Sequence, residues 1–279
     1  MMLTNRQFDR TQQLALRLAG IELVERHREL LLRRSRRLGI QDDAALDELI
    51  RAVEAGEPLA TRQFLGLLTT KFTGFFRHPA HFEAAAEQAL LAVKQRGAAH
   101  IWSAGTATGE EAWSVAMAVT ERFQSGVPPV CILATDVDAG ALAVAERGEY
   151  SEAVLKPVSA ERRARFFVPP NCVRVGPALR KLLELQPLNL VAGEWPMTGG
   201  FDVIFCRNVL MYLEARHRQA VLERMAALLA PDGLLMLDPS EHPAGAANLF
   251  NPASDGIYSL KHNRSATLHP EGVGCRTGR

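Results

Sequence analysis

Residues 100–117, HIWSAGTATGEEAWSVAM, constrain the fold of this chain more than any other segment. A short apolar strand ends at a glycine turn, Gly105–Gly109, and apolar residues at helical spacing follow Glu110 and Glu111. Open α/β sheets build nucleotide sites from this order of elements, because small residues let the backbone approach a ligand at the carboxyl end of a strand. The segment therefore favours a parallel sheet and marks the turn as a candidate ligand site.

The residues of the turn restrict which ligand it can hold. The dinucleotide fingerprint G-x-G-x-x-G is absent, and no Lys-Ser or Lys-Thr pair follows as in a phosphate-binding loop. Two glutamates beside the turn would repel a pyrophosphate and would suit a positively charged ligand. S-adenosylmethionine, with its sulfonium and ammonium groups, is such a ligand. These residues alone are equally compatible with a tight turn beside two solvated glutamates.

From about residue 98 onward, apolar strand-like runs alternate with helical patterns. Strands joined by helical crossovers predict a doubly wound, mostly parallel sheet, so the expected fold class is α/β. This domain is expected to span residues 98–262, with a small β insertion at about 165–187. The expected strands are 100–104, 130–135, 183–190, 201–208, 233–237 and 256–261, and the helices after the first crossover are 139–147, 160–167 and 215–229.

The first 75 residues form a separate region, because no strand signal interrupts their helical spacing. They are expected to form an N-terminal all-helical domain (1–75), followed by a linker helix (76–97). Phe75, Phe76 and Arg77, just before Pro79, predict a fixed joint between the domains. The polar residues 263–279 are expected to be a flexible tail. The expected N-terminal helices are Gln7–Ala19, Glu22–Leu38, Ala44–Ala55 and Ala60–Lys71.

The second of these helices carries a basic stripe. Arg26, Arg33 and Arg37 recur at steps of seven and four residues and so share one helix face. The net charge of the chain is only +1, so an electrostatic partner must recognise a local patch such as this one. The stripe is compatible with an ordinary solvated face and with a docking surface for an acidic partner. Nucleic acid is not expected, because no aromatic residues are interleaved for base stacking.

The cysteines and histidines give no sign of a metal site. His78 and His81 have no third ligand at a useful spacing, so no metal is expected. No apolar run approaches the roughly 18 residues needed to cross a bilayer, so no membrane insertion is expected. The cysteines lack any C-x-x-C pair, which predicts reduced thiols in a cytoplasmic protein, without disulfides or zinc. They are Cys131, Cys172, Cys206 and Cys275.

Two further strands end in polar residues that suit an adenosine ligand. Asp136 follows strand 130–135, and an acid at the end of the second strand of a β-α-β unit commonly binds ribose hydroxyls. Asp138 is also near this position, although it would serve well as a helix N-cap. Arg207 and Asn208 end strand 201–208, where a ligand at the switch point of the sheet would lie.

Four blocks of sequence occur together in one order: LTTKFTGFFR, IWSAGTATGEEAWSVAM, ATDVDAGALAVAERGEY, and FDVIFCRNVLMYL with the downstream APDGLLML and PSE. Over about residues 8–262 the chain resembles the CheR family of chemotaxis receptor methyltransferases. The resemblance implies an S-adenosylmethionine-dependent methyltransferase fold and a cytoplasmic, monomeric enzyme. Its implied activity is transfer of a methyl group to glutamate side chains of chemotaxis receptors, leaving S-adenosylhomocysteine as the product.

The resemblance also implies the roles of individual residues. Arg77 and Tyr212 are expected to be catalytic, orienting the acceptor carboxylate. Glu111 is the expected cofactor contact of the glutamate pair, whereas Glu110 is expected to face solvent or to cap the helix. The residues expected to bind the cofactor are Lys71, Thr73, Arg77, Glu111, Asp136, Asn189, Leu190, Arg207 and Asn208.

The sequence departs from the family pattern at several places. Lys71 replaces a usual asparagine, Trp113 replaces a usual tyrosine, and Asp238-Pro239 replaces a glycine-containing pair. Residues 165–187 are short for the family's small β-subdomain, which can bind a receptor's carboxy-terminal pentapeptide. Whether this chain is tethered to receptors in that way is left open by its sequence.

Chemistry at a glutamate needs little from the protein beyond geometry. The carboxylate is already ionised at neutral pH, so its attack on a methyl group needs no general base. The protein must exclude water and align the two reacting atoms. Two other readings fit the same motifs: a methyltransferase with a different substrate, and a cofactor-sensing regulator without catalysis. A dehydrogenase is disfavoured because the glycine fingerprint is missing.

Overall fold

The computed structural model describes residues 3–40, 42–69, 73–123, 126–169 and 173–261. Four helices pack together in the N-terminal part of this range, and a short 3-10 helix, η1 (Glu25–His27), leads into the second of them. Thr4 and Gln7 form a capping box that begins the first helix, and Gly20, with φ of 63°, ends it. These helices are α1 (Asn5–Ala19), α2 (Arg28–Arg37), α3 (Asp43–Glu54) and α4 (Pro58–Leu68).

A seven-stranded sheet forms the centre of the molecule, with the order β3-β2-β1-β4-β5-β7-β6. Strands β1 to β5 are parallel, and β7 and β6 add an antiparallel hairpin at one edge. The strand order reverses between β1 and β4, where Ile101 is in register with Val203. The strands are β1 (Ala99–Ala104), β2 (Val130–Asp136), β3 (Leu183–Pro187), β4 (Phe201–Phe205), β5 (Leu229–Met236), β6 (Phe250–Ser254) and β7 (Ile257–Leu260).

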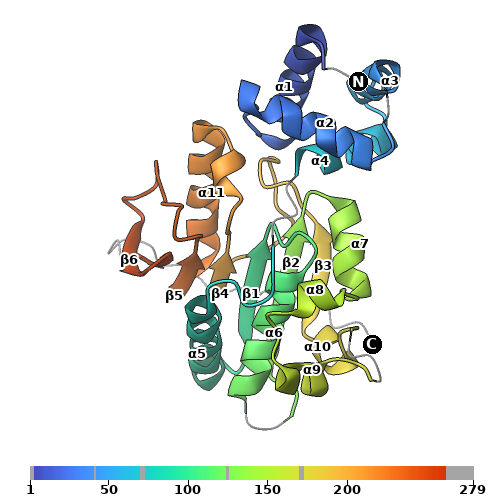
Figure 1. Ribbon diagram of the computed structural model, residues 1–279. Coiled ribbons are helices and arrows are strands. Elements are labelled where there is room, and N and C mark those ends of the chain that lie inside the picture. The colour runs from blue at the N-terminus through green and yellow to red at the C-terminus, as the bar shows by residue number, and fades with distance from the viewer. Residues whose placement is uncertain (1–2, 41, 70–72, 124–125, 170–172, 262–279) are drawn as a thin grey trace.

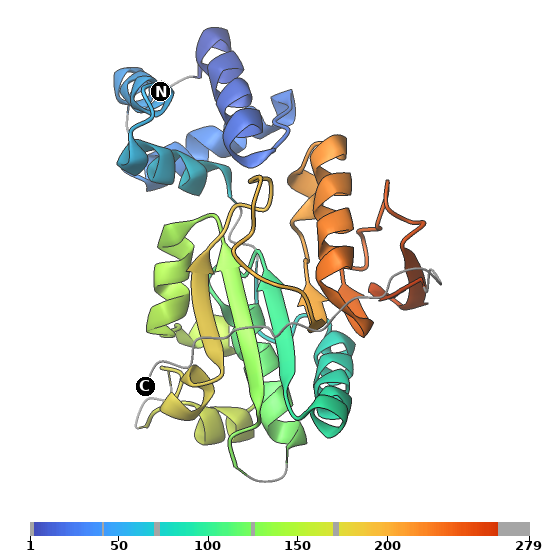
Figure 2. The same ribbon diagram turned by 180° about the vertical axis from the view of Figure 1, so that it is seen from behind.

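Helices cover both faces of the sheet, and each face has its own apolar core. Consecutive residues of β1 point to opposite faces, so Ile101 packs with residues of α5 and α6 while Trp102 packs with residues of α11 and the N-terminal helices. Figure 1 shows α6 in front of the strands, and Figure 2 shows it behind them. These helices are α5 (Pro79–Arg96), α6 (Glu110–Arg122), α7 (Ala139–Arg147), α8 (Glu152–Leu155), α9 (Ala160–Phe166), α10 (Pro177–Arg180) and α11 (Ala215–Leu228), with the 3-10 helix η2 (Leu210–Tyr212).

The N-terminal helices lie beyond the carboxyl ends of the parallel strands (Figures 1 and 2). The backbone after α1 pairs with the backbone after η2 through an antiparallel bridge between Ile21 and Leu213. Glu22 N donates to the Tyr212 carbonyl at 3.0 Å, and Glu214 N donates to the Gly20 carbonyl at 2.9 Å. The N-terminal part is therefore fastened by backbone hydrogen bonds to the segment that carries a candidate catalytic tyrosine.

The doubly wound α/β fold predicted from the sequence is confirmed, with corrections at its edges. The second N-terminal helix begins at Arg28 rather than Glu22, because residues 22–24 are not helical, Val24 has an extended backbone, and His27 Nδ1 accepts a hydrogen bond from Val24 N at 3.0 Å. Strand β6 was not predicted. The expected linker helix is α5, which packs on β1 and β4. The expected tail lies outside the described residues.

The region predicted as a small β insertion contains little sheet in the part of it that the structure describes. Within this region, Phe167 and Val175 form an isolated β-bridge, and β3 belongs to the main sheet. A second isolated bridge joins Arg174 to Glu149, which lies before the region. The cysteine prediction is correct for Cys206, a buried free thiol, and wrong for Cys131, which is disulfide-bonded. Spacing along the chain did not reveal that pairing, because a disulfide depends on proximity in space.

The structure offers neither a membrane span nor a metal cluster within the residues it describes. No helix in that part of the chain is long and apolar enough to cross a bilayer. No group of three or more His, Cys, Asp or Glu side chains within the same ranges is placed to hold a metal ion.

Candidate active site

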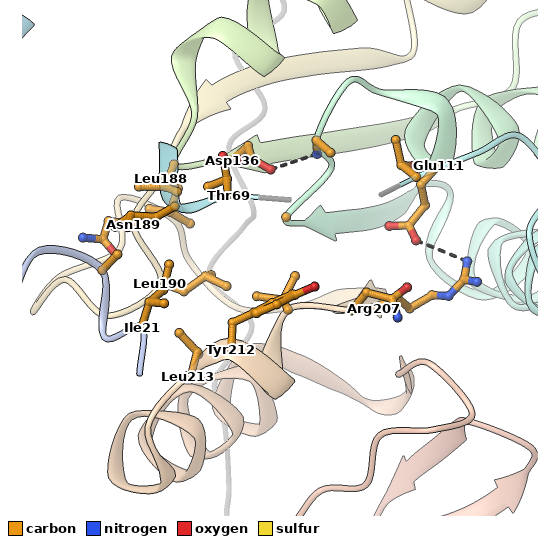
Figure 3. Close-up of a pocket in the computed structure, with 18 of the residues that line it drawn as sticks. Ile21, Thr69, Glu111, Asp136, Leu188, Asn189, Leu190, Arg207, Tyr212 and Leu213 are labelled. Atoms are coloured by element: carbon orange, nitrogen blue, oxygen red, sulfur yellow. Dashed lines mark hydrogen bonds and ion pairs between the residues drawn. The ribbon is translucent and has the colours of Figure 1, made fainter. Parts of the chain in front are cut away.

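A pocket lies where the carboxyl ends of the central parallel strands face the N-terminal helices, with about 980 Å³ of empty space, part of it open to solvent. Every predicted site residue that the structure describes lines this pocket, and Lys71 lies outside the described residues. Figure 3 shows Asp136 and Glu111 on one side, with Leu190, Tyr212 and Arg207 opposite. The predicted residues that line it are Thr73, Arg77, Glu111, Asp136, Asn189, Leu190, Arg207, Asn208 and Tyr212.

The glycine turn after β1 forms one wall of the pocket. Gly105 has φ of 77°, and a Cβ at this position would collide with Cγ2 of Val209, so only glycine fits. Ala107 also has a positive φ, 50°, which is uncommon for a residue with a side chain. The amides of Gly105 and Thr106 both donate to the Thr135 carbonyl, at 2.8 and 2.9 Å. The turn is thereby fixed against the end of β2.

Asp136 is held at the end of β2 by backbone donors. Its Oδ2 accepts from Ala107 N and its Oδ1 accepts from Asp138 N, each at 2.8 Å. Burial raises the pKa of Asp136, and these backbone hydrogen bonds oppose the rise. Each carboxylate oxygen can still accept a second hydrogen bond, so the group can bind hydroxyls in the pocket. Asp138 caps α7 as its position suggested, because its Oδ1 accepts from Gly140 N and Ala141 N.

Glu111 joins the first turn of α6 to the tip of β4. Its Oε2 lies 3.2 Å from Nη1 of Arg207, and its Oε1 accepts from the Ser103 hydroxyl at 2.8 Å. Burial raises the pKa of Glu111, and the charge of Arg207 opposes the rise. Arg207 also donates from Nη2 to the Arg77 carbonyl at 2.8 Å, while its buried Nε has no hydrogen-bond partner among the described residues.

Glu110 does not face solvent, which is one of the two alternatives expected for it, and the N-cap of α6 is Gly109. The side chain of Glu110 is buried, its Oε2 accepts from the Thr108 hydroxyl at 2.7 Å, and burial raises its pKa. The reason is the tight packing of this turn, in which the Tyr150 hydroxyl donates to the Thr108 carbonyl at 2.7 Å. Trp113 is also core rather than pocket, with its indole NH donating to the Ala145 carbonyl at 3.3 Å.

Arg77 and Tyr212 reach the pocket from opposite directions along the chain. Arg77 precedes α5, and its Nη2 lies 3.3 Å from Oδ2 of Asp238. Tyr212 ends η2, and its carbonyl is bonded to Glu22 N at 3.0 Å. Both side chains line the pocket and remain partly exposed. They are therefore placed to meet a second reactant that enters from solvent.

Asn189 has a structural role in addition to lining the pocket. Its Nδ2 donates to the Leu18 carbonyl at 2.6 Å, and its Oδ1 accepts from Val191 N at 3.1 Å. The side chain therefore fastens the end of α1 to the loop after β3. Its neighbour Leu190 contributes an apolar surface to the pocket (Figure 3).

Sequence reasoning missed several residues of the site. Glu241 is buried, and its two oxygens accept from Asn208 N at 2.8 Å and Met211 N at 3.0 Å, which fixes the loop that carries Asn208 and Tyr212. The motif PSE ends in this acid, but the motif itself indicates no role for it. Two N-terminal residues of the pocket carry no sequence signal, because apolar residues at or just after a helix end look like ordinary core. They are Ala19 and Ile21. Leu68 and Thr69 also line the pocket, and they open the block LTTKFTGFFR without an expected role.

Comparison with known proteins decides the family. A family model described as "CheR methyltransferase, SAM binding domain" matches residues 71–257. The chain belongs to the CheR family. Chemotaxis protein methyltransferase 2 of Pseudomonas aeruginosa is 36% identical over 262 residues, covering 92% of this chain and 93% of the relative. The chemotaxis protein methyltransferase of Escherichia coli is 33% identical over 268 residues, covering 92% of each.

These matches confirm the family that the sequence motifs indicated. They also confirm the predicted methyltransferase activity and S-adenosylmethionine as the cofactor. The pocket fits this cofactor on its own geometry. A glycine turn admits close backbone approach, Asp136 has acceptor capacity for ribose hydroxyls, and Leu188 and Leu190 supply apolar surface. The pocket is lined by two acids, Glu111 and Asp136, and by two arginines, Arg77 and Arg207, so it offers groups of both signs to a ligand that carries a sulfonium, an ammonium and a carboxylate.

Proposed function

We propose that this CheR protein methylates glutamate side chains of chemotaxis receptors. The observation that carries the proposal is the joint position of Arg77 and Tyr212, partly exposed at the pocket that also contains the predicted cofactor residues. An arginine and a phenol hydroxyl are suitable donors for an acceptor carboxylate. The names of the relatives, chemotaxis protein methyltransferases, support the same pathway. A cytoplasmic, monomeric enzyme remains our expectation.

Within the pocket, we assign the cofactor's parts by chemistry. Asp136 receives the ribose hydroxyls, and Leu190 with the backbone of the loop after β3 borders the base. Glu111, Arg207 and Asn208 surround the amino-acid end, where both signs of charge must be matched. Thr73 and Arg77 close this end from the N-terminal side. Lys71, which lies outside the described residues, belongs to the same group of assignments.

When bound, S-adenosylmethionine supplies a methyl group carried on a sulfonium. The residues of the chain need only orient the acceptor and exclude water, because a glutamate carboxylate is already ionised at neutral pH. In this proposal the hydroxyl of Tyr212 lies closer to the acceptor carboxylate than Arg77 does, since a neutral hydroxyl orients an anion without forming an ion pair with it. Arg77 provides a second donor at the entrance of the pocket. Loss of water around the two opposite charges favours the charge-dispersed transition state.

The receptor is proposed to dock on the basic face near α2. Arg26 and Arg33 are exposed, and the side chain of Arg37 lies outside the described residues. Arg26 belongs to η1 rather than to α2, so the face is a short basic patch and not a continuous helical stripe. Arg34 points elsewhere, because its Nη1 donates to the carbonyls of Leu67 and Leu68. Residues 1–75 are proposed as the domain that presents this patch, and residues 98–262 as the catalytic domain.

The experiment is incubation of the protein with methyl-labelled S-adenosylmethionine and receptor-rich membranes. Label in the receptor band that is released by mild base, as expected of a glutamate methyl ester, supports the proposal. Cofactor binding without transfer to any membrane protein would contradict it.

A further inference from the structure

Asp238, which follows β5, is a buried carboxylate with a fixed orientation. Its side chain is 6% exposed. Its Oδ1 accepts two hydrogen bonds from Ser240, from the backbone N at 3.1 Å and from the hydroxyl at 2.6 Å. Because Ser240 holds one oxygen, the direction of the other oxygen is also set.

The second oxygen faces a cationic group at the pocket. Oδ2 of Asp238 is fully buried and lies 3.3 Å from Nη2 of Arg77 and 3.6 Å from Nε2 of His78. Burial raises the pKa of Asp238, but the hydrogen bonds from Ser240 and the charge of Arg77 outweigh that effect, so the pKa lies below its ordinary range. Asp238 is therefore an anion at neutral pH.

Asp238 reaches the pocket only through its neighbours. Arg77 lines the pocket, and Asp238 does not. The backbone of Arg77 is held independently, since Nη2 of Arg207 donates to the Arg77 carbonyl. Asp238 therefore adds an ion pair that positions the guanidinium of Arg77 and places a negative charge against it.

That charge matters for a reaction in which the acceptor is itself a carboxylate. An arginine without a counter-ion forms strong, often bidentate pairs with carboxylates. Such a pair would hold the acceptor glutamate tightly and lower its reactivity as a nucleophile. An arginine already paired with Asp238 keeps its donor geometry but attracts the acceptor less.

We propose that Asp238 is a positioning residue for methyl transfer, which holds the side chain of Arg77 at the pocket and balances its charge so that the acceptor carboxylate is oriented and stays reactive. This inference rests on the proposed function. It predicts that loss of the Asp238 charge acts on turnover rather than on receptor affinity, and that it acts through Arg77.

The test is a double-mutant cycle of Asp238→Asn and Arg77→Gln, measured by labelled methyl transfer to receptor membranes under single-turnover and steady-state conditions. Asp238→Asn keeps the size of the side chain and an acceptor for Ser240. We expect it to lower kcat about tenfold without raising the receptor KM, and to have less than about a twofold effect when Arg77 is already Gln. Asp232→Asn is the matched control, because Asp232 also pairs with an arginine, Arg96, but lies in β5 away from the pocket. It should leave kcat unchanged.

S-adenosylhomocysteine binding by calorimetry shows whether each variant has a folded pocket. If Asp238→Asn does not fold, Asp238→Ser, which keeps a hydroxyl near Ser240, takes its place in the cycle. The inference would be overturned if Asp238→Asn lowered kcat by the same factor in the wild type and in Arg77→Gln. It would also be overturned if Asp238→Asn raised the receptor KM and left kcat unchanged. The proposed function would stand in both cases. A wild-type protein that labels no receptor would contradict the proposed function and this inference with it.

Discussion

The guanidinium of Arg207 lies 3.2 Å from the carboxylate of Glu111, although the two residues are 96 positions apart in the chain. This buried ion pair joins the tip of β4 to the first turn of α6 across the point where the strand order reverses (Figure 3). A ligand at this switch point therefore meets both charges together. The site is built from residues that follow the ends of strands. Their relative positions therefore depend on how the strands pair in the sheet.

Tyr212→Phe should lower turnover far more than cofactor affinity. The change removes only the hydroxyl, and a hydrogen bond to a charged group contributes roughly 1.5–3 kcal/mol, which corresponds to about 10- to 100-fold in rate. Labelled methyl transfer to receptor membranes measures the turnover, and calorimetry with S-adenosylhomocysteine measures the affinity. Tyr258→Phe, in the edge strand β7, is the control. Unchanged turnover in Tyr212→Phe would remove the hydroxyl from the mechanism.

Asp136→Asn should weaken binding of S-adenosylhomocysteine by roughly 10- to 100-fold, because the charged acceptor for the ribose hydroxyls is lost. The amide can still accept from Ala107 N through its oxygen, so the turn after β1 should persist. Isothermal titration calorimetry gives the affinity, and circular dichroism shows that the fold is kept. An affinity equal to that of the wild type would refute the ribose assignment.

Glu110→Gln should stabilise the protein at neutral pH. Burial raises the pKa of Glu110, so the folded state favours the neutral form of this group. Its contribution to stability is present below the unfolded pKa of about 4.3 and is lost as the pH rises through the higher folded pKa. The neutral glutamine keeps an oxygen for the Thr108 hydroxyl without that loss. Thermal unfolding is measured from below about pH 4 to neutral pH. The melting temperature of the variant should rise relative to that of the wild type as the pH rises. A difference in melting temperature that does not change with pH would contradict the raised pKa of Glu110.

Gly105→Ala should destabilise the protein more than Gly97→Ala does. Both glycines have positive φ, 77° and 81°, so both substitutions bear the cost of that backbone conformation, about 1 kcal/mol. Only at Gly105 does the new Cβ also meet Val209, whereas the space around Gly97 is open. Denaturant unfolding measures both free energies. The difference between them isolates the close approach at the pocket, and equal losses would mean that Val209 moves aside freely.

Reversing Arg26 and Arg33 to glutamate should raise the receptor KM and leave cofactor binding unchanged. Both side chains are exposed, and each reversal turns attraction for an acidic surface into repulsion. Arg62→Glu is the matched control, because Arg62 is an exposed arginine on α4 outside the basic patch. The effect should shrink with added salt. Loss of cofactor binding in the double variant would instead indicate a damaged N-terminal domain.

The site residues at the strand ends could be predicted from the sequence, since each follows a recognisable apolar strand. Gly105, Asp136 and Arg207 each follow an apolar run, and parallel topology then brings such positions to one edge of a sheet. The fold class followed from the same alternation of strands and helices. The roles of Arg77 and Tyr212 came from the family resemblance, and the structure places both at the pocket.

The parts that escaped prediction depend on contacts between distant segments. Ile21 gave no sign of lying in the pocket, because its position follows from the bridge to Leu213 across 192 residues of sequence. Glu241 is hidden for the same reason, since its role is to accept from backbone amides that no side-chain pattern reveals. The burial of Glu110 depends on Tyr150 closing over the turn. Local periodicity carries no information about such pairings.

The most direct test of the account is to identify the atom that receives the methyl group. Purified protein is incubated with deuterated-methyl S-adenosylmethionine and receptor membranes, and receptor peptides are then sequenced by mass spectrometry before and after mild base. The account predicts the added methyl mass on glutamate residues of the receptor, removed by base, and reduced about 10- to 100-fold with Tyr212→Phe at matched times. Label on another kind of residue or on a protein that is not a receptor, or no transfer by a wild-type protein that binds the cofactor, would contradict it.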